Sequence, residues 1–141
     1  MQSNEKNLDL RDFLERLEAE EPDSVLRIPE TVGLDFDVTA VAMELEKQGR
    51  APVIRFDKVG NFPFPVVTNL FGDRRRYALA LGVAEADLIE TWASLGEKTI
   101  EPTMCETGPI LDVVKTGGDV DLAQLPILNH FAEDGGRYVT N

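Results

Sequence analysis

Two apolar runs on either side of a proline-rich turn constrain the fold of this chain more than any other feature of its sequence. Residues 52–56 and 66–70 have the alternating or β-branched composition of strands. The turn between them, at residues 61–65, contains two prolines, which have no backbone N–H to donate to a sheet. We therefore expect the two runs to be antiparallel neighbours in one sheet.

Helical periodicity recurs on both sides of this pair of strands. Apolar side chains spaced three and four residues apart predict helices over residues 10–17, 38–45, 74–81 and 88–95. These helices are flanked by residues that favour a helix start or a helix end. In chain order they are Asp9, Pro22, Asp35 or Asp37, Gly49, Asp73, Gly82 and Gly96.

Shorter elements account for most of the remaining chain. Residues 24–28 are predicted to form a strand that Pro29 ends, and residues 109–114 are predicted to form another. A turn at residues 117–118 precedes a short helical turn at residues 121–125. Because helices and strands are interspersed without a regular βαβ repeat, we expect an α+β fold, arranged as a mixed α/β sandwich.

The charge balance excludes several classes of partner. The chain has 14 basic and 26 acidic residues, a formal net charge of −12. Nucleic acid and anionic membranes both attract clustered Lys and Arg, so neither is an expected partner. No apolar run approaches the roughly 20 residues that span a bilayer, and the first residues lack the apolar stretch of a signal peptide. The sequence therefore predicts a cytoplasmic protein whose excess acid favours solubility.

Several catalytic motifs are missing from the sequence. It contains no phosphate-binding P-loop, no dinucleotide-binding glycine fingerprint and no serine nucleophile elbow. The one histidine, His130, excludes a site built from several histidines, and the one cysteine, Cys105, excludes an internal disulfide. Cys105 is expected to be a small, half-buried residue beside Met104, and a Cys105–His130 dyad is disfavoured.

Arg74, Arg75 and Arg76 stand in the first turn of the third predicted helix, where cations oppose the helix dipole. An acidic group is therefore expected to face them. A carboxylate of this acidic chain is the favoured candidate; a bound phosphate and an ion pair to another domain or subunit are the alternatives.

His130 has two carboxylates near it in the sequence, Glu133 and Asp134. A histidine with nearby carboxylates is able to bind a divalent ion. A histidine is also able to relay a proton. Closeness in sequence does not by itself bring ligands together, so the favoured interpretation is a loop histidine at a domain junction.

Three aromatic residues divide into two cases. Trp92 shares a helix face with Leu88 and Leu95, which predicts a place in the core. Phe62 and Phe64 alternate with prolines in the rigid turn, so they mark an interface or pack under the neighbouring helix, with no preference between the two.

Three stretches, taken in their order along the chain, carry a resemblance to a known family. They comprise residues 9–17; residues 56–60, 65–76 and 80–82; and residues 119–122, 125–127 and 134–138. They resemble the UbiD family of decarboxylases: the first its opening helix, the second its strand, loop and "NLFG" helix entry, and the third its approach to the flavin domain. The resemblance covers nearly the whole chain, and its specificity comes from the order of the stretches.

The resemblance implies a division of the chain into domains. Residues 1–8 would be a polar tail, residues 9–108 the N-terminal α+β domain, and residues 109–141 a linker and the start of the flavin-binding domain. That start would include the first strand of a split barrel. The chain would then be the front part of a longer enzyme, inactive alone, with most of the chemistry beyond residue 141.

The resemblance also implies an activity: reversible, non-oxidative decarboxylation of an aromatic or α,β-unsaturated carboxylic acid. The family uses prenylated FMN as the electron sink, with a divalent metal, typically Mn²⁺, and K⁺. Its members tend to form homo-oligomers. The alternative is a non-catalytic subunit or binding module of a multi-subunit carboxylase, and an unrelated acidic interaction domain is the least favoured hypothesis.

Few of the family's functional residues have counterparts here. Its metal-binding Asn, His and Glu and its catalytic Arg and Glu come later in the chain. Asn141 falls just before the first of them and is not the metal-binding Asn, so no catalytic or metal-binding residue is assigned. The candidates nearest the flavin are Tyr138, Thr140 and Asn141. Of these, Thr140 and Asn141 are predicted to contact the cofactor at the edge of its site.

Overall fold

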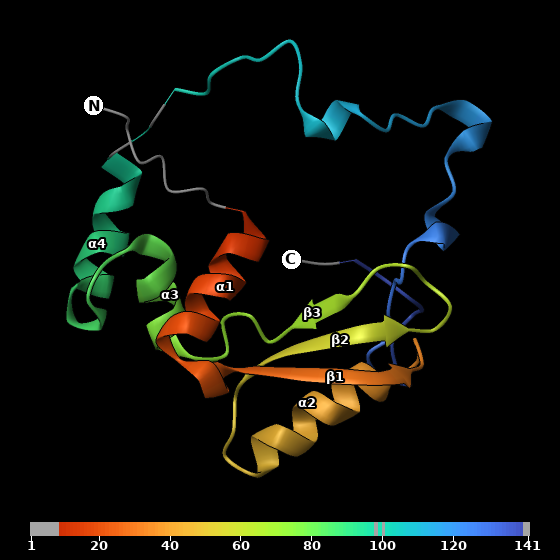
Figure 1. Ribbon diagram of the computed structural model, residues 1–141, viewed down its shortest axis with the longest axis horizontal. Helices are drawn as coiled ribbons and strands as arrows, with labels where there is room; N and C mark the ends of the chain where they lie inside the picture. The colour runs from red at the N-terminus through yellow and green to blue at the C-terminus, as the bar shows by residue number, and fades with distance from the viewer. Residues whose placement is uncertain (1–8, 98, 100, 140–141) are drawn as a thin grey trace.

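The computed structural model describes residues 9–97, 99 and 101–139. A three-stranded sheet, in the order β1-β2-β3, lies at its centre (Figure 1). The strands are β1 (Val25–Val32), β2 (Val53–Val59) and β3 (Val66–Thr68). β2 pairs in parallel with β1 and antiparallel with β3. The antiparallel pair predicted around the proline-rich turn is thus confirmed, and so is the α+β fold class.

Four helices accompany the sheet, as the periodicity predicted. Their bounds are α1 (Leu10–Glu20), α2 (Asp37–Lys47), α3 (Arg74–Leu81) and α4 (Leu88–Ser94). Six short 3₁₀ turns complete the described elements: Pro22–Ser24, Glu85–Asp87, Leu95–Glu97, Pro109–Leu111, Gly117–Asp119 and Leu122–Gln124. Among the described residues, no helix is long and apolar enough to cross a membrane.

The main core lies between α2 and one face of the sheet. It joins Val38 and Leu45 of α2 to Ile54, Phe56 and Val59 of β2. The three β2 residues are completely buried, because β2 is the central strand and α2 covers this face. The parallel pairing of β1 and β2, which the sequence did not predict, follows from the α2 crossover between them.

A second core cluster lies where α1 and α3 meet the beginning of β2. Leu14 and Leu17 of α1 bury Val53, on the sheet face opposite Ile54. α1 begins where predicted, because the Asp9 carboxylate accepts a hydrogen bond from the backbone N–H of Arg11 at 2.7 Å. The body of the molecule, residues 9–97, is thus held by two clusters that share β2.

The prediction that Pro29 ends the first strand is wrong. β1 continues to Val32, and its register with β2 shifts between Ile28 and Thr31. Because β1 is an edge strand, the backbone N–H that Pro29 lacks is not needed for pairing on its open side. The shift in register accommodates the proline on the side that pairs with β2.

The start of α2 also differs from expectation. The helix begins at Asp37, and its N-cap is Phe36, which has a φ of 70° and makes no capping hydrogen bond. The Asp37 carboxylate instead accepts a hydrogen bond from the backbone N–H of Gly33 at 2.7 Å. The preceding loop, residues 33–36, is therefore tied to the first turn of α2.

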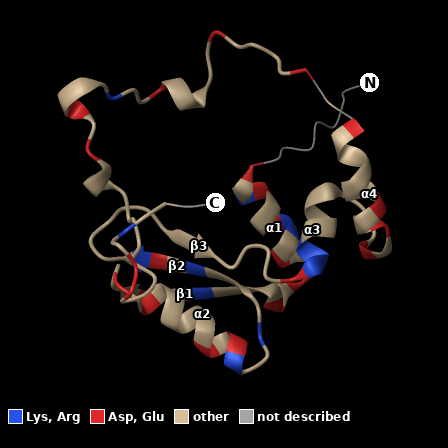
Figure 2. Ribbon diagram, turned by 180° about the vertical axis from the view of Figure 1, so that it is seen from behind, with Lys and Arg blue, Asp and Glu red and all other residues tan. Residues whose placement is uncertain are grey.

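Residues 101–125, which we name the arm, arch away from the body and return to it near the end of β1 (Figure 1). Almost every arm residue is exposed, and the charged residues along its ribbon are mostly acidic (Figure 2). The strand predicted at residues 109–114 is wrong: Pro109–Leu111 is a 3₁₀ turn, and Ile110 is 86% exposed. The predicted helical turn is confirmed, at Leu122–Gln124.

Two further burial predictions are wrong. Trp92 is 60% exposed, because α4 is anchored by Leu88 and no described element covers the rest of its apolar face. Cys105 is exposed in the arm beside Met104, which is also exposed. Residues 137–139, where a strand was expected to begin, have no regular structure, and the polar tail at residues 1–8 lies outside the described residues.

Candidate functional site

Residues 126–139 return from the arm to the start of α2, and we name this contact region the junction. In Figure 1 this dark blue segment lies beside the end of β1. The backbone N–H of Asn129 donates to the carbonyl of Leu34 at 3.0 Å, and the N–H of Phe36 donates to the carbonyl of Asn129 at 2.9 Å. Asp35 and Asn129 thus form an isolated parallel bridge. Leu128 packs against the main core.

Side chains reinforce the backbone contacts of the junction. The Arg137 guanidinium pairs with the Asp35 carboxylate at 3.0 Å, across 102 positions of the sequence. His130 Nδ1 and Thr39 Oγ1 are hydrogen-bonded at 2.9 Å. The His130 ring also packs against the ring of Tyr138, with 5.4 Å between their centroids. The start of α2 therefore holds the last described residues through both charge and packing.

The carboxylates near His130 do not converge on its ring. The Asp134 carboxylate accepts hydrogen bonds from the backbone N–H groups of Phe131 and His130, at 2.8 and 3.2 Å, and so stabilises its own turn. Within the described ranges, no group of three or more His, Cys, Asp or Glu side chains is placed to hold a metal ion. The structure favours a loop histidine at a junction over a metal ligand.

The predicted cofactor residues fall at the edge of what the structure describes. Thr140 and Asn141 lie outside the described residues, so their contact with the flavin stays a prediction. Tyr138 is half-exposed beside His130. The Cys105 thiol contacts the carbonyl of Thr103, and His130 contacts Thr39. Among the described residues, Cys105 and His130 are therefore not hydrogen-bonded to each other.

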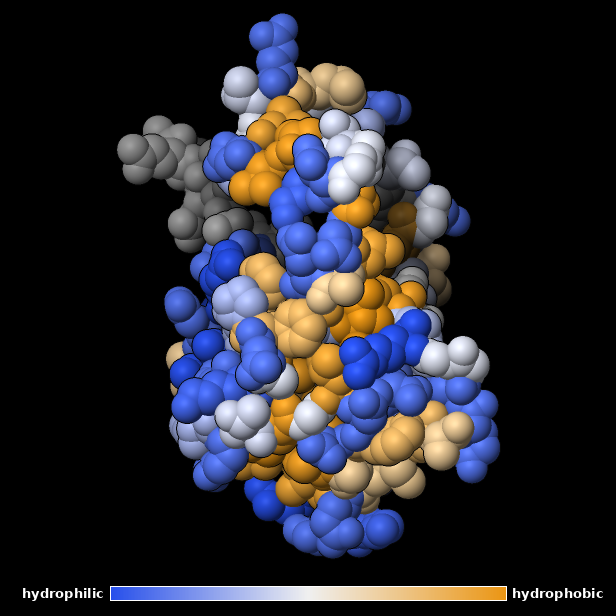
Figure 3. Space-filling model, turned by 90° about the vertical axis from the view of Figure 1, so that its right-hand side faces the viewer, coloured by the Kyte–Doolittle hydropathy of each residue, from blue (hydrophilic) through white to orange (hydrophobic). Residues whose placement is uncertain are grey.

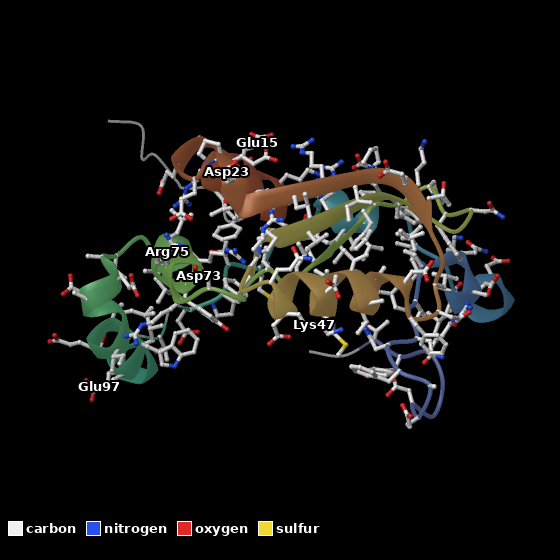
Figure 4. The ribbon with its side chains drawn as sticks, turned by 90° about the horizontal axis from the view of Figure 1, so that it is seen from below. Glu15, Asp23, Lys47, Asp73, Arg75 and Glu97 are labelled. Atoms are coloured by element: carbon white, nitrogen blue, oxygen red, sulfur yellow. The ribbon has the colours of Figure 1, made fainter. Side chains whose placement is uncertain are left out.

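The three arginines at the start of α3 have three different environments. Arg75 pairs with Asp73 at 2.7 Å and with Glu21 at 3.3 Å, which confirms the expected carboxylate partner (Figure 4). Arg76 is buried, and its guanidinium donates to the carbonyls of Asn69 and Ala51. Arg74 is exposed and has no ion pair among the described residues.

These environments shift three pKa values, and the hydrogen bond and charge of Asp73 raise that of the Arg75 guanidinium. The hydrogen bonds from the Arg75 side chain and from its backbone N–H lower the pKa of the Asp73 carboxyl to about 2. Burial lowers the pKa of the Arg76 guanidinium from its ordinary value, since its nearest acceptors are neutral carbonyls. No sequence pattern predicts this buried cation, because both acceptors are backbone atoms.

A cleft of about 510 Å³ opens beside these arginines. It is lined by equal numbers of basic and acidic side chains: Arg50, Arg75, Arg76, Glu21, Asp23 and Asp73. Asp73 already occupies the start of α3, since its carboxylate accepts a hydrogen bond from the backbone N–H of Arg75 at 2.9 Å. The balance of charge favours a structural network over the phosphate site considered as an alternative.

The "NLFG" stretch has a physical explanation in this network. Asn69 adopts a left-handed φ of 57°, and its Nδ2 donates to the carbonyl of Pro52 at 2.8 Å. The residue three positions later must be glycine, because a Cβ at Gly72 would collide with the Asn69 side chain. The stretch therefore ties the end of β3 to the beginning of β2.

The two phenylalanines of the turn line a groove rather than pack under a helix. Phe62 and Phe64 border a cavity of about 600 Å³, whose other wall is formed by arm residues between Lys115 and Leu125. Phe64 is 47% exposed. In the space-filling view of Figure 3, apolar side chains run in a band from the arm at the top of the molecule down onto the body. The interface alternative therefore remains open for this loop.

The described residues thus form an α+β body with an arm that returns to it at the junction. Residues 14–95 match the family model of the 3-octaprenyl-4-hydroxybenzoate carboxy-lyase N-terminal domain, and residues 103–141 match its Rift-related domain. The chain belongs to the UbiD family, as the resemblance predicted. At the level of the family, this identifies it as related to carboxy-lyases.

Relatives of known sequence agree with this assignment. The chain is 31% identical over 130 residues to the anhydromevalonate phosphate decarboxylase of Methanosarcina mazei, covering 92% of this chain and 28% of the relative. It is 29% identical over 157 residues to an uncharacterised protein of Aquifex aeolicus, covering 96% of this chain and 32% of the relative. The chain thus spans less than a third of the length of these relatives.

Solved structures show the same fold. An evolved dimeric form of the UbiD-class enzyme HmfF from Pelotomaculum thermopropionicum, in complex with prenylated FMN (prFMN), is 29% identical with a TM-score of 0.78. The match covers 92% of this chain and 30% of that one. The vanillic acid decarboxylase of Sedimentibacter hydroxybenzoicus is also 29% identical with a TM-score of 0.78, over 93% of this chain and 29% of that one.

Proposed function

We propose that this chain is the N-terminal part of a UbiD-like decarboxylase that uses prenylated FMN. The reaction would be the reversible, non-oxidative decarboxylation of an aromatic or α,β-unsaturated carboxylic acid. The observation that carries the proposal is the consecutive match of residues 14–95 and 103–141 to two family domains, in a chain that spans less than a third of its relatives.

The division of labour between the domains is part of the proposal. Residues 9–108 would form the N-terminal domain, and residues 109–141 would lead into the flavin-binding domain. The exposed apolar side chains of the arm support this division, because such side chains are normally covered in a finished fold. They include Met104, Ile110, Val113, Val114 and Leu122.

The described residues do not themselves provide a site for the metal ions of the family. No described cluster of carboxylate, imidazole or thiolate groups has the composition of a metal site. On the family resemblance, the residues that bind Mn²⁺ and K⁺ would lie mostly outside this chain, and we derive no catalytic step through these ions. Thr140 and Asn141 remain the candidates for contact with the flavin.

The proposal extends to partners and location. A carboxylic acid substrate, a homo-oligomeric assembly of the complete enzyme and a cytoplasmic location are all expected. The net charge of −12 supports the absence of nucleic-acid and anionic membrane partners. The neighbour from Pelotomaculum thermopropionicum has been observed in a dimeric form, which supports an oligomer for this enzyme.

The intact mass of the protein isolated from its native source tests the proposal. A mass about three- to fourfold above the 15.6 kDa of this chain would agree with it. The isolated protein should then contain a bound flavin and release CO₂ from an unsaturated or aromatic acid. A mass of 15.6 kDa, with no flavin, would overturn the proposal in favour of a separate non-catalytic subunit.

A further inference from the structure

Helices α3 and α4 carry a group of exposed apolar side chains that no other described element covers. Ile89 is 65% exposed, and Trp92, Tyr77 and Phe71 are exposed as well. The rings of Phe71 and Tyr77 stack with 4.5 Å between their centroids, so the group runs from the loop before α3 onto that helix. We name these four residues the helical patch. A contiguous apolar group of this kind marks a binding surface, whereas single exposed apolar residues do not.

A cavity joins the α3 part of the patch to the α4 part. Its volume is about 320 Å³, and it is lined by Tyr77, Leu88, Ile89, Trp92 and Ala93. Within the described residues, no charged side chain lines this cavity. Small-molecule sites combine an apolar lining with a few polar groups that orient the ligand. A lining of this composition therefore fits the apolar side chains of a protein partner better than it fits a small molecule.

The composition of the patch is that of the centre of a protein interface. Three of its four residues are Phe, Tyr and Trp, and aromatic residues are enriched at the centres of such interfaces. The patch also combines two highly exposed side chains, Ile89 and Trp92, with a cavity beside them. A surface that presents side chains and a cavity next to each other is able to bind a second copy of itself across a two-fold axis.

Charges of opposite sign border the patch. Arg74 lies one turn before Tyr77 in α3, and it is exposed without an ion pair among the described residues. Glu90 follows Ile89 in α4 and is also exposed. Figure 2 shows the basic start of α3 and the acidic residues around α4. A two-fold contact brings the basic border of one copy to the acidic border of the other, which offsets the repulsion between two acidic chains.

The patch and the junction lie at different ends of the body. In Figure 1, α3 and α4 stand at one end and the junction at the other. A second copy reaches the patch directly, whereas residues that follow the junction would have to cross the body to cover it. The position of the patch therefore favours a second copy as the partner.

We propose that the helical patch is a two-fold interface between copies of this protein. Ile89 and Trp92 of each copy fill the cavity beside Tyr77 of the other, and Arg74 of each copy faces Glu90 of the other. The patch is then the surface that forms the homo-oligomer of the proposed function, on which this inference rests.

The test uses the complete protein, as its native source makes it, with single substitutions. Trp92→Ala removes the largest side chain of the patch, and Ile89→Asp places a charge at its centre. The matched control is Met43→Asp, which changes an exposed apolar side chain of α2, away from the patch. Sedimentation over a range of protein concentrations measures the mass of the particle and its dissociation constant. Circular dichroism and thermal unfolding establish that each variant is folded.

The wild-type protein is expected to sediment as a dimer or as a multiple of one. Trp92→Ala and Ile89→Asp should each raise the dissociation constant at least about thirtyfold, because a side chain at an interface centre carries much of the binding energy. Met43→Asp should leave the dissociation constant at the wild-type value.

A charge swap tests the two-fold geometry. Arg74→Glu and Glu90→Arg should each raise the dissociation constant about two- to fivefold, the range for an exposed ion pair. The double variant should recover part of this loss, because the reversed charges again face each other across the axis. Losses that simply add in the double variant would overturn the pairing of Arg74 with Glu90.

Two results would overturn the interface as a whole. The first is a wild-type protein that is monomeric at every concentration. The second is a pair of patch variants, Trp92→Ala and Ile89→Asp, that keep the wild-type mass and dissociation constant. A lower thermal midpoint in such variants would mean that another part of the same protein, rather than a second copy, covers the patch.

The interface and the proposed function fail in distinguishable ways. A protein that contains flavin and releases CO₂, but whose patch variants keep the wild-type mass, would overturn the interface alone. A chain of 15.6 kDa without flavin would overturn the proposed function. The mass of its particle, with and without the patch substitutions, would still decide whether the patch joins two copies.

Discussion

The body and the arm are both rich in apolar residues, and yet they fold differently. In the body, β2 has a strand on each side and α2 across one face, so that Ile54, Phe56 and Val59 are fully buried. In the arm, Ile110 and its apolar neighbours have no such layer against them among the described residues. An apolar pattern becomes a strand only where a neighbour pairs with it and covers it.

The difference separates the part of the chain that has a core of its own from the part whose apolar side chains lack a covering layer among the described residues. The body has two core clusters that share β2, whereas the arm has short 3₁₀ turns and exposed side chains. The junction lies between these extremes, since Leu128 reaches the main core while Tyr138 remains half-exposed. Stability should therefore fall steeply from the body to the arm.

The largest expected effect is in the core of the body. Phe56→Ala should lower the free energy of unfolding by about 3–5 kcal/mol, because it leaves a cavity beneath α2. Denaturant unfolding of the chain, followed by circular dichroism, measures it. Phe64→Ala, at a side chain that is 47% exposed, is the control and should cost about 1 kcal/mol or less. Equal losses at the two positions would contradict the core described here.

The next effect sharpens the comparison in the arm. Ile110→Ser should change the stability of residues 1–141 by less than about 0.5 kcal/mol, because Ile110 is 86% exposed. In the longer enzyme that we propose, the same change should cost about 1.5–3 kcal/mol, the value of burying such a side chain. Parallel unfolding of the two proteins gives the difference. An equal, small cost in both would mean that the remainder of the enzyme leaves Ile110 uncovered.

A third effect concerns Arg76, which links α3 to the segments before β2 and after β3. Arg76→Met should cost about 1–3 kcal/mol, because it deprives the carbonyls of Asn69 and Ala51 of their donor. Arg74→Met provides the control, since Arg74 is exposed and should contribute less than about 0.5 kcal/mol. Denaturant midpoints of the two variants, measured side by side, decide the point. A smaller loss at Arg76 than at Arg74 would show that the buried guanidinium is dispensable.

The sequence predicted those parts of the fold whose signals are local. Asp9 and Asp73 begin helices and Gly82 ends one, because each acts on backbone groups within a few positions. Pro29 is equally local, but its effect depended on β1 being an edge strand, which only the assembled sheet determines. The prediction that Trp92 is buried was wrong for a related reason, because helical spacing identifies an apolar face but not the element that covers it.

The candidate site was less predictable than the fold. His130 was predicted to be a loop histidine at a domain junction; the structure shows it in a loop, bonded to Thr39 of α2, and the domain boundary itself stays a prediction. The pairing of Asp35 with Arg137 was missed, because nothing in either local sequence points to a partner 102 positions away. Thr140 and Asn141 rested on the family resemblance alone, and they remain predictions because they lie outside the described residues.

The smallest expected effect concerns the pH dependence of the body at Asp73. Its pKa is lowered to about 2, below the ordinary value of an aspartate carboxyl, chiefly by the hydrogen bond from the Arg75 side chain. A lowered pKa in the folded state means that ionised Asp73 stabilises the body above about pH 4, and that this contribution is lost as the pH falls through about 2. Asp73→Asn should therefore cost about 0.5–1 kcal/mol at pH 7 and progressively less as the pH falls to 2. Unfolding free energies measured between pH 2 and 7 give the difference curve, and Arg75→Gln should flatten it, whereas an unchanged curve would mean that the Asp73–Arg75 pair does not set the pKa.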